Sequence, residues 1–438
     1  MRRDILTALA DWKNSKRRKP LLLRGARQTG KTYLLQEFGA SAYERCHYFN
    51  FEEEPALASV FEPDLDPERI IRDLSLLRGT SIRRGKDLII LDEVQFSNGA
   101  LNSLKYFQER AGGYHIAAAG SLLGVTLSKP RSFPVGKVTL MTLTPMTFYE
   151  FLDALDKSAY RQRLESLSES RPTADAVHQA LLSLLRTYYL VGGMPEAVQS
   201  FVDDADFGTV RQIQRGIVDA YVLDFAKYPP TSDVPKLTQI WNSLPAQLAR
   251  ENKRFLFSAA KEGARAREYE NALLWLENAG AVIRSFCVDA PRRPLTAYAN
   301  RSLYKMYVLD VGLLGAVSGL APELLLEGDA LFTEFRGALA ENYVCQELRN
   351  AVGLDVFYWR NPRGHAEVDF VLESGGSVVP LEVKAGINPR SRSLRAFADK
   401  YGCERLYRTT ALNFRRDGAI TNIPLYAVGS LPNLVRAP

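Results

Sequence analysis

The sequence predicts a multidomain α/β protein whose N-terminal part is built on a parallel sheet. The chain has 438 residues, which is too many for one hydrophobic core and suits about two to four domains of roughly 100–150 residues each. Within residues 1–150, short apolar runs at 20–24, 48–51, 88–91 and 115–120 alternate with helical patterns. Strands that alternate with helices are typical of a parallel sheet.

Changes in sequence pattern divide the chain into four predicted segments. Residues 1–150 form the first α/β segment, and residues 151–230 are predicted to be helical. Residues 231–325 contain helical patterns followed by strand-like runs. Residues 331–438 begin with a helical pattern and continue with alternating strands and another helix, which predicts a second α/β domain at the C-terminal end.

The composition excludes several classes of protein. Hydrophobic residues make up 46% and charged residues 24% of the chain, which is typical of globular proteins and excludes a disordered or fibrous one. No apolar run approaches the ~20 residues of a membrane-spanning helix, and no secretory signal is visible. The 4 cysteines are scattered, which predicts free thiols and a cytoplasmic protein. A net charge of +6 is compatible with a nucleic-acid partner.

The strongest motif runs from Gly25 to Thr32 and follows the pattern of a phosphate-binding loop between a strand and a helix. Gly25 and Gly30 allow the backbone to turn its N–H groups toward phosphate oxygens. Lys31 is expected to reach the β- and γ-phosphates, and the Thr32 hydroxyl to bind Mg²⁺. The motif therefore predicts ATP and Mg²⁺ as cofactors. The expected nucleotide-binding residues are Gly25, Ala26, Arg27, Gln28, Thr29, Gly30, Lys31 and Thr32.

A second motif, which is acidic, completes a predicted ATPase site. The apolar run at 88–91 ends in Asp92 and Glu93; Asp92 is expected to hold Mg²⁺ and Glu93 to polarise the attacking water. Ser121 follows the next predicted strand and is expected either to sense the γ-phosphate or to cap a following helix. Further along, Arg131 and Lys137 are candidates for contacts with a neighbouring nucleotide, or are solvated surface charges.

The C-terminal segment contains a predicted hairpin that gathers charged side chains. Glycines at 375–376 suit a two-residue turn, and pairing around this turn places Asp369 opposite Glu382 and Glu367 opposite Lys384. Because side chains alternate along a strand, Asp369, Glu382 and Lys384 are expected on one face.

Two interpretations of this face stay open. In the first, Asp369 and Glu382, with Glu341 from the preceding helix, bind Mg²⁺, and Lys384 positions or deprotonates a metal-bound water. In the second, cross-strand ion pairs form on a solvated face of the sheet, Glu367 with Lys384 and Glu382 with an arginine. The first interpretation predicts a site for phosphodiester chemistry, and the second predicts a network of ion pairs with a structural role.

The third segment has the pattern of a winged helix. A predicted amphipathic helix at 268–278 is followed by a glycine turn and a strand at 281–288. Basic residues near this helix suit either phosphate contacts, which give affinity without sequence preference, or a solvated surface. These residues are Lys253, Arg254, Lys261, Arg265, Arg267, Arg292 and Arg293.

Taken together, the motifs resemble a family across nearly the whole chain: the predicted AAA-superfamily P-loop ATPases with a C-terminal domain related to PD-(D/E)xK nucleases. The matching stretches are residues 25–32, 91–95, 120–121, 143–152, 192–196, 305–314 and 341–344, with Glu367, Asp369, Glu382 and Lys384. The resemblance implies an ATPase core, a helical and winged-helix-like middle region, and a restriction-nuclease-like end. Where the family has Gly-Arg, this chain has Gly136-Lys137, and lysine lacks the planar, bidentate contact of an arginine finger.

The sequence therefore predicts an Mg²⁺-dependent ATPase coupled to a domain that binds DNA and, under the first interpretation of the carboxylate face, cleaves it. The alternative is a nucleotide-operated switch in which the C-terminal domain is a binding platform for DNA or protein. A homo-oligomer would be required if a neighbouring chain supplied a catalytic arginine. No protein partner and no membrane association is indicated.

Overall fold

A computed structural model describes residues 1–121, 136–167, 172–250, 253–321, 333–362, 364–387 and 391–436. The chain forms two compact units. The N-terminal unit consists of Arg2–Thr144 with Asn278–Gly280, and the C-terminal unit consists of Met1, Pro145–Glu277 and Ala281–Pro438. The predicted segments 151–230, 231–325 and 331–438 thus fall almost entirely within one compact unit.

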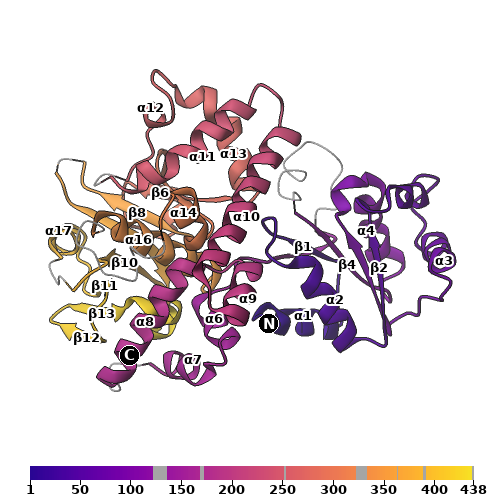
Figure 1. Cartoon of the computed structure of the whole chain (residues 1–438), viewed down its shortest axis with the longest axis horizontal. Coiled ribbons are helices and arrows are strands. Elements are labelled where there is room, and N and C mark those ends of the chain that lie inside the picture. Colours follow the sequence, from indigo (N-terminus) through magenta and orange to yellow (C-terminus); the bar gives the residue numbers. More distant parts are fainter. Residues whose placement is uncertain are drawn as a thin grey trace. The chain divides into compact units, whose positions relative to one another are not determined.

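The N-terminal unit is built on the parallel sheet that the sequence predicts (Figure 1). Its strands are β1 (Leu21–Arg24), β2 (Arg45–Asn50), β3 (Asp87–Asp92), β4 (His115–Gly120) and β5 (Thr139–Thr142), and they lie in the order β2-β3-β4-β1-β5. Every neighbouring pair is parallel. As a result, all five strands end at the same edge of the sheet.

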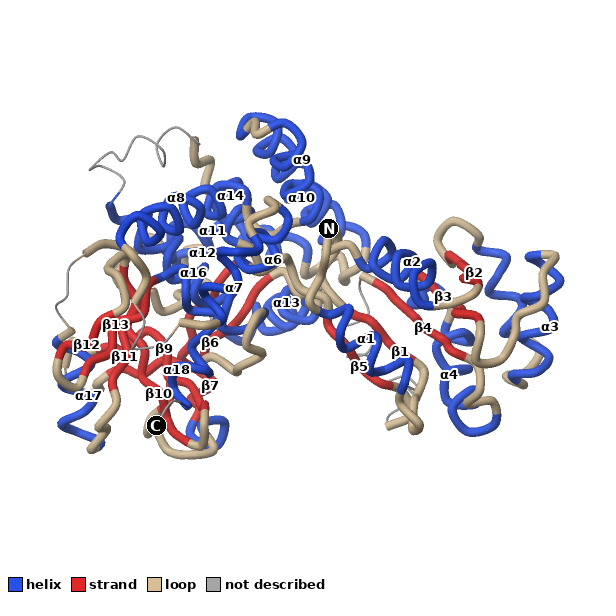
Figure 2. Tube along the Cα trace, turned by 90° about the horizontal axis from the view of Figure 1, so that it is seen from below, coloured by secondary structure: helices blue, strands red, loops and turns tan. Residues whose placement is uncertain are grey.

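Helices cover both faces of this sheet because its strands are apolar on both sides. They are α1 (Ile5–Asn14), α2 (Lys31–Ala42), α3 (Pro67–Arg78) and α4 (Asn98–Arg110), with short 3₁₀ helices at Pro55–Phe61 (η1) and Val94–Phe96 (η2). Successive residues of β3 point to opposite faces: Leu88 and Ile90 pack with α1 and α2, whereas Ile89 and Leu91 pack with α3 and α4. Figure 2 shows the strands in red with the helices in blue.

The C-terminal unit combines a helical region with a mixed eight-stranded sheet, whose order is β12-β13-β11-β10-β9-β8-β6-β7. Its helices are α6 (Phe148–Ala154), α7 (Ser158–Glu165), α8 (Asp175–Val191), α9 (Pro195–Asp204), α10 (Phe207–Lys227), α11 (Val234–Leu248), α12 (Phe257–Ala260), α13 (Ala266–Asn278), α14 (Val311–Val317), α16 (Thr333–Asn350), α17 (Arg392–Tyr401) and α18 (Leu431–Arg436), with 3₁₀ helices η3 (Leu295–Tyr298) and η5 (Leu425–Ser430). Its strands are β6 (Val282–Val288), β7 (Ala299–Val308), β8 (Phe357–Arg360), β9 (Glu367–Ser374), β10 (Ser377–Val383), β11 (Leu406–Thr410), β12 (Arg415–Asp417) and β13 (Ile420–Pro424).

The strands expected to form a separate winged-helix-like domain instead belong to this large sheet. β6 and β7 form an antiparallel pair, and β6 also pairs with β8 through Phe286–Phe357 and Cys287–Tyr358. The physical reason is that β6 forms backbone hydrogen bonds along both of its edges, to β7 on one side and to β8 on the other. The two strands that follow α13 therefore do not form a separate small sheet. Residues 231–325 and 331–438 are therefore joined by a continuous ladder of backbone hydrogen bonds.

The Gly-Gly-Met-Pro-Glu motif at 192–196 has a structural role within the C-terminal unit. A Cβ atom on Gly193 would lie 2.0 Å from the carbonyl oxygen of Met146, and one on Gly192 would lie 2.2 Å from Oδ1 of Asp310. The backbone N–H of Gly193 donates to the Asp310 carboxylate at 2.6 Å. The motif thus lets the backbone approach a buried carboxylate too closely for any side chain.

Two general expectations about the chain were that its cysteines are unpaired and that it does not span a membrane. Cys46, Cys287, Cys345 and Cys403 are all free thiols. Across the described residues, no helix combines the length and the apolar character needed to cross a bilayer.

Candidate functional site

The phosphate-binding loop lies between β1 and α2, as predicted. Gln28 has a φ of 61° and Gly30 a φ of 87°, so two residues of the loop have a left-handed backbone conformation before the helix begins at Lys31. A Cβ atom on Gly25 would lie 2.2 Å from the carbonyl oxygen of Leu143, so only glycine fits there. The buried Thr29 side chain closes the loop by donating to the carbonyl of Ala26 at 2.9 Å.

Lys31 lies inside this loop. Its ammonium donates to the carbonyl oxygens of Gly25 at 3.1 Å and Ala26 at 2.8 Å. Burial lowers the pKa of Lys31 to about 8, although the carboxylates of Glu93 and Asp92 act in the opposite direction. A buried ammonium held by two neutral carbonyls is favourable for an incoming phosphate, which would supply the counter-charge that the carbonyls do not.

The two expected Mg²⁺ ligands lie together. The Thr32 hydroxyl donates to Oδ2 of Asp92 at 2.6 Å. The same oxygen accepts a hydrogen bond from the Tyr48 hydroxyl at 3.0 Å, and Asn50 donates to Tyr48 at 3.1 Å. A hydroxyl next to a buried carboxylate at the end of a strand fits the oxygen ligands that Mg²⁺ prefers.

Glu93 lies directly beside this pair. Its backbone is left-handed, with a φ of 50°, and its N–H donates to Oδ1 of Asp92 at 2.9 Å. The Ser121 hydroxyl lies 3.3 Å from Oε2 of Glu93, and the side-chain amide of Gln95 donates to the same oxygen. The strand order explains the meeting of Glu93 and Ser121, because β4 is the neighbour of β3.

Of the two basic residues that were candidates for contacting a neighbouring nucleotide, only Lys137 lies within the described residues. Lys137 forms an ion pair of 2.9 Å with Glu109 of its own unit, and its side chain is 39% exposed. Arg131 lies outside the described residues.

Family comparisons agree with this geometry for the N-terminal unit. Residues 17–152 match the family described as an AAA domain. By this match, the N-terminal unit is similar to AAA-type P-loop domains. The rest of the chain matches two families without an assigned function: residues 182–324 match the domain of unknown function DUF8612, and residues 336–428 match DUF4143. No curated protein matches the chain.

Several solved structures are distantly similar. The Walker-type ATPase paby2304 of Pyrococcus abyssi is 14% identical, with a TM-score of 0.46, and the match covers 72% of this chain and 95% of that one. The Aeropyrum pernix ORC1 protein in complex with DNA is 17% identical, with a TM-score of 0.30, covering 72% and 90%. The Thermotoga maritima RuvB Holliday junction branch migration motor is 14% identical, with a TM-score of 0.29, covering 64% and 87%.

The predicted hairpin is present in the C-terminal unit with the predicted register. β9 and β10 pair from Ser374–Ser377 to Phe370–Leu381. Just beyond these pairs, the N–H of Val383 donates to Oδ2 of Asp369 at 2.9 Å. The Lys384 ammonium lies 2.9 Å from Oε1 of Glu382, so these two expected site residues are in contact.

A lysine that the sequence analysis gave no role lies among the expected metal ligands. The ammonium of Lys305, on β7, lies 3.0 Å from Glu341, 2.7 Å from Glu367 and 3.5 Å from Asp369. Glu341, which the sequence predicts as a metal ligand, also accepts a hydrogen bond from Lys253. Glu367 was expected to pair with Lys384 and instead pairs with Lys305. No group of three or more His, Cys, Asp or Glu residues in the described parts of the chain is arranged to hold a metal ion.

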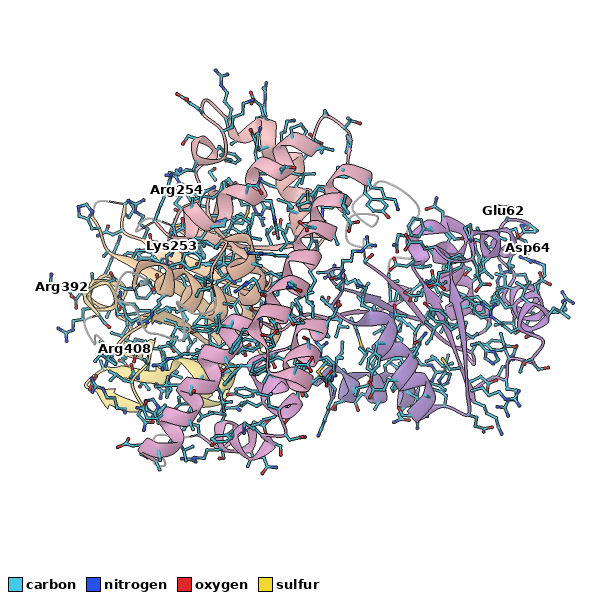
Figure 3. The ribbon with its side chains drawn as sticks, viewed as in Figure 1. Glu62, Asp64, Lys253, Arg254, Arg392 and Arg408 are labelled. Atoms are coloured by element: carbon cyan, nitrogen blue, oxygen red, sulfur yellow. The ribbon has the colours of Figure 1, made fainter. Side chains whose placement is uncertain are left out.

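The basic residues near α13 fall into two groups. Lys261, Arg265, Arg267, Arg292 and Arg293 are exposed, whereas Lys253 and Arg254 are half-buried. Lys253 and Arg254 are labelled in Figure 3. Because Lys253 binds the buried Glu341, it contributes to an internal ion pair and is poorly placed to contact DNA.

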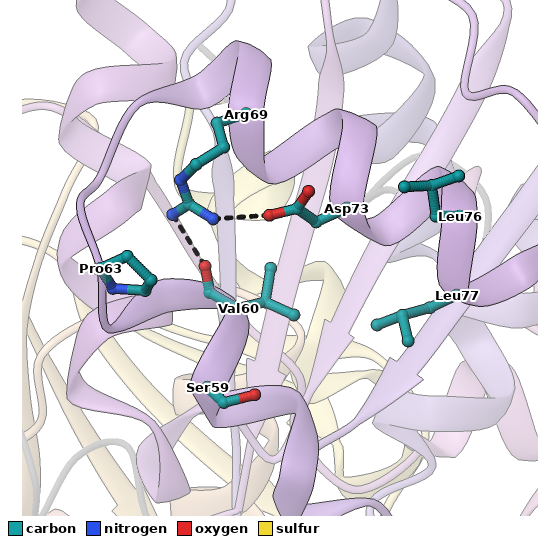
Figure 4. Close-up of a pocket in the computed structure, with 7 residues that line it drawn as sticks. All are labelled: Ser59, Val60, Pro63, Arg69, Asp73, Leu76 and Leu77. Carbon is teal, nitrogen blue, oxygen red and sulfur yellow. Dashed lines mark hydrogen bonds and ion pairs between the residues drawn. The ribbon is translucent and has the colours of Figure 1, made fainter.

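A separate pocket of about 430 Å³ opens on the N-terminal unit between η1 and α3 (Figure 4). It is lined by Ser59, Val60, Pro63, Arg69, Asp73, Leu76 and Leu77. The Arg69 guanidinium is already bound to Asp73 at 2.7 Å and to the carbonyl of Val60 at 2.9 Å. The pocket contains no residue of the nucleotide site.

Sequence reasoning missed Lys305, Tyr48 and Gln95. For Lys305 a signal exists: it is the one charged residue in the apolar run of residues 303–309, between Tyr304 and Met306. A lysine in such a place needs a buried carboxylate partner. Tyr48 and Gln95 give no comparable signal, because tyrosine and glutamine are common in strands and turns.

Proposed function

We propose that the chain binds and hydrolyses ATP with Mg²⁺ at the N-terminal unit. The observation that carries this proposal is the contact between Thr32 and Asp92, with Lys31 in the loop on one side and Glu93 on the other. These are the phosphate-binding, metal-binding and water-activating groups that phosphoryl transfer requires.

Each residue has a defined task in this reaction. Lys31 leaves the carbonyls of Gly25 and Ala26 and binds the β- and γ-phosphate oxygens. Thr32 and Asp92 would hold Mg²⁺, whose positive charge would offset the negative charge of the phosphates. Oε1 of Glu93 accepts the proton of the attacking water, while Ser121 and Gln95 hold the other oxygen, Oε2.

The test of ATP binding is the substitution Lys31→Ala in the full chain. Titration with a fluorescent ATP analogue should show binding to the wild type and none to the variant. Lys86→Ala is the matched control, because Lys86 is an exposed lysine of the same unit that pairs only with Glu44. Retained tight binding by the Lys31 variant would refute the assignment.

The proposal extends to DNA as the partner of the C-terminal unit. Support comes from exposed cations in the first turn of α13 and on either side of this helix, which suit contacts with phosphate groups. If ATP turnover is coupled to DNA, adding single- or double-stranded DNA should stimulate the ATPase rate, and Arg265→Ala with Arg267→Ala should reduce that stimulation. An unchanged rate with every form of DNA would count against coupling.

DNA cleavage at Asp369, Glu382 and Lys384, with Glu341, is the more specific form of this proposal. Plasmid nicking with Mg²⁺ or Mn²⁺, abolished in Asp369→Ala, would support it, and no cleavage with any divalent ion would remove it. The rival function is a nucleotide-operated switch with a non-cleaving platform. The position of Lys305 favours this rival, because its ammonium already faces three carboxylates of the cluster.

A further inference from the structure

The carboxylate cluster of the C-terminal unit has a lysine at its centre. Lys305 is on β7 and its side chain is only 1% exposed. Three carboxylates from two elements converge on the ammonium: Glu341 from α16, and Glu367 and Asp369 from β9. The aromatic ring of Tyr358, on β8, lies 5.2 Å from the same nitrogen.

This lysine is held in its charged form. Burial alone would lower the pKa of Lys305, but the carboxylates of Glu341, Glu367 and Asp369 raise it well above its usual value. A buried ammonium is tolerated only when carboxylates compensate its charge, and the same argument holds for the carboxylates. Despite burial, Lys253 and Lys305 lower the pKa of Glu341 to about 2. Burial and the neighbouring Glu341 raise the pKa of Asp369 to about 6, although Lys305 acts in the opposite direction.

The remaining carboxylate oxygens of the cluster are largely engaged by other protein groups. Glu341 also accepts hydrogen bonds from Lys253 and, at 2.5 Å, from the Tyr307 hydroxyl. Asp369 accepts the N–H of Val383 through its second oxygen. Glu382 pairs with Lys384 through Oε1, and its Oε2 is buried without a hydrogen-bond partner. Mg²⁺ in proteins is bound by one or two carboxylates together with several waters. Among the described carboxylates of this cluster, Lys305 already occupies the position that Glu341, Glu367 and Asp369 would offer to such an ion.

The residues of the cluster thus do not fit the divalent ion that a nuclease-like site would need. We infer that Lys305 is a built-in cation that takes the place of a divalent metal ion among Glu341, Glu367 and Asp369. The C-terminal carboxylate cluster is then complete without metal. This inference concerns the C-terminal unit alone and does not depend on whether the N-terminal unit hydrolyses ATP.

The test measures Mn²⁺ binding to the full chain without nucleotide, by equilibrium dialysis. The wild type and Asp369→Asn should bind the same amount, because the cluster takes no metal. Lys305→Met removes the ammonium and keeps an unbranched side chain that is shorter by one atom, so this variant should gain about one Mn²⁺ per chain. The gain should disappear in the double variant Lys305→Met with Asp369→Asn. Lys86→Met, at an exposed lysine, should behave as the wild type.

A second measurement reports the same property through stability. Mn²⁺ should raise the Tm of Lys305→Met by several degrees and leave the Tm of the wild type unchanged, because only the variant has uncompensated carboxylates. Wild-type binding of Mn²⁺ that Asp369→Asn removes would overturn the inference, and so would a folded Lys305→Met that binds no additional Mn²⁺. If Lys305→Met does not fold, the comparison of the wild type with Asp369→Asn still decides the question.

Discussion

The Thr32 hydroxyl donates a hydrogen bond of 2.6 Å to the Asp92 carboxylate, although the two residues are 60 positions apart in the sequence. They meet because β1 and β3 run parallel, so the loop after one and the acidic turn after the other lie at the same edge of the sheet. β4 lies between these strands and brings Ser121 to the same edge. Three loops thus build one site.

Glu93→Gln should separate nucleotide binding from hydrolysis. Glutamine preserves the shape of the side chain but cannot take a proton from water, so kcat should fall by about 10²- to 10⁴-fold while the affinity for ATP is retained. Phosphate release and analogue titration measure the two quantities. Glu62→Gln, at an exposed glutamate of the same unit, should leave both unchanged. Equal losses of kcat and affinity would show that Glu93 acts mainly on binding.

Tyr48→Phe should weaken the hold on Mg²⁺. The Tyr48 hydroxyl donates to Oδ2 of Asp92, and a hydrogen bond to a charged group contributes about 1.5–3 kcal/mol. Without it, the Mg²⁺ concentration that gives half-maximal ATPase rate should rise by roughly tenfold or more. Tyr114→Phe is the control, because its hydroxyl lies 3.4 Å from Glu68 on the surface. An unchanged Mg²⁺ dependence would mean that Thr32 alone orients Asp92.

Gly193→Ala should destabilise the C-terminal unit strongly. The new methyl group would meet the backbone carbonyl of Met146 at 2.0 Å, and backbone cannot move away as a flexible side chain can. We expect the free energy of unfolding to fall by about 3 kcal/mol. Gly216→Ala, in α10 with no atom within 4 Å of the new methyl, should be neutral or stabilising. Urea denaturation of both variants compares them, and similar midpoints would contradict the prediction.

Asp310→Asn should change how stability depends on pH. Burial raises the pKa of Asp310 to about 6, although the N–H groups of Gly193 and Leu313 act in the opposite direction. Because the folded state holds this proton more tightly than the unfolded state, the contribution of Asp310 is largest below pH ~4 and is lost as the pH rises to ~6. The difference between the Tm of the wild type and the Tm of Asp310→Asn should therefore become smaller as the pH rises from ~4 to ~6. Parallel Tm curves would contradict the assignment.

The sequence predicts the parts of the sites that depend on neighbouring residues. The loop at 25–32 and the hairpin at 367–384 were both predicted, the second with its register, because a glycine turn fixes the pairing of the strands it joins. Asp92 and Glu93 could be predicted because they come directly after the apolar run of a predicted strand. These features depend on a few consecutive residues each.

The rest depends on contacts between distant segments. Nothing near Lys305 indicates that Glu341 and Glu367 will surround it, because they come from a helix and a strand that follow in the chain. The prediction of a winged-helix-like domain over residues 231–325 also left out a long-range contact: the helix, the turn and the strands are present, but β6 pairs with β8. Local patterns predict elements, and long-range pairing decides which sheet receives them.

The ladder between β6 and β8 has a consequence for dissecting the protein. A fragment that begins at residue 333 would lose β6 and β7, so β8 would become an exposed edge strand, which invites pairing with other chains. It would also lose Lys305 and Lys253 and leave Glu341 buried without a counter-charge. We expect such a fragment to aggregate. A fragment of this end of the chain should therefore contain the whole eight-stranded sheet together with Lys305 on β7 and with Lys253, which precedes α12.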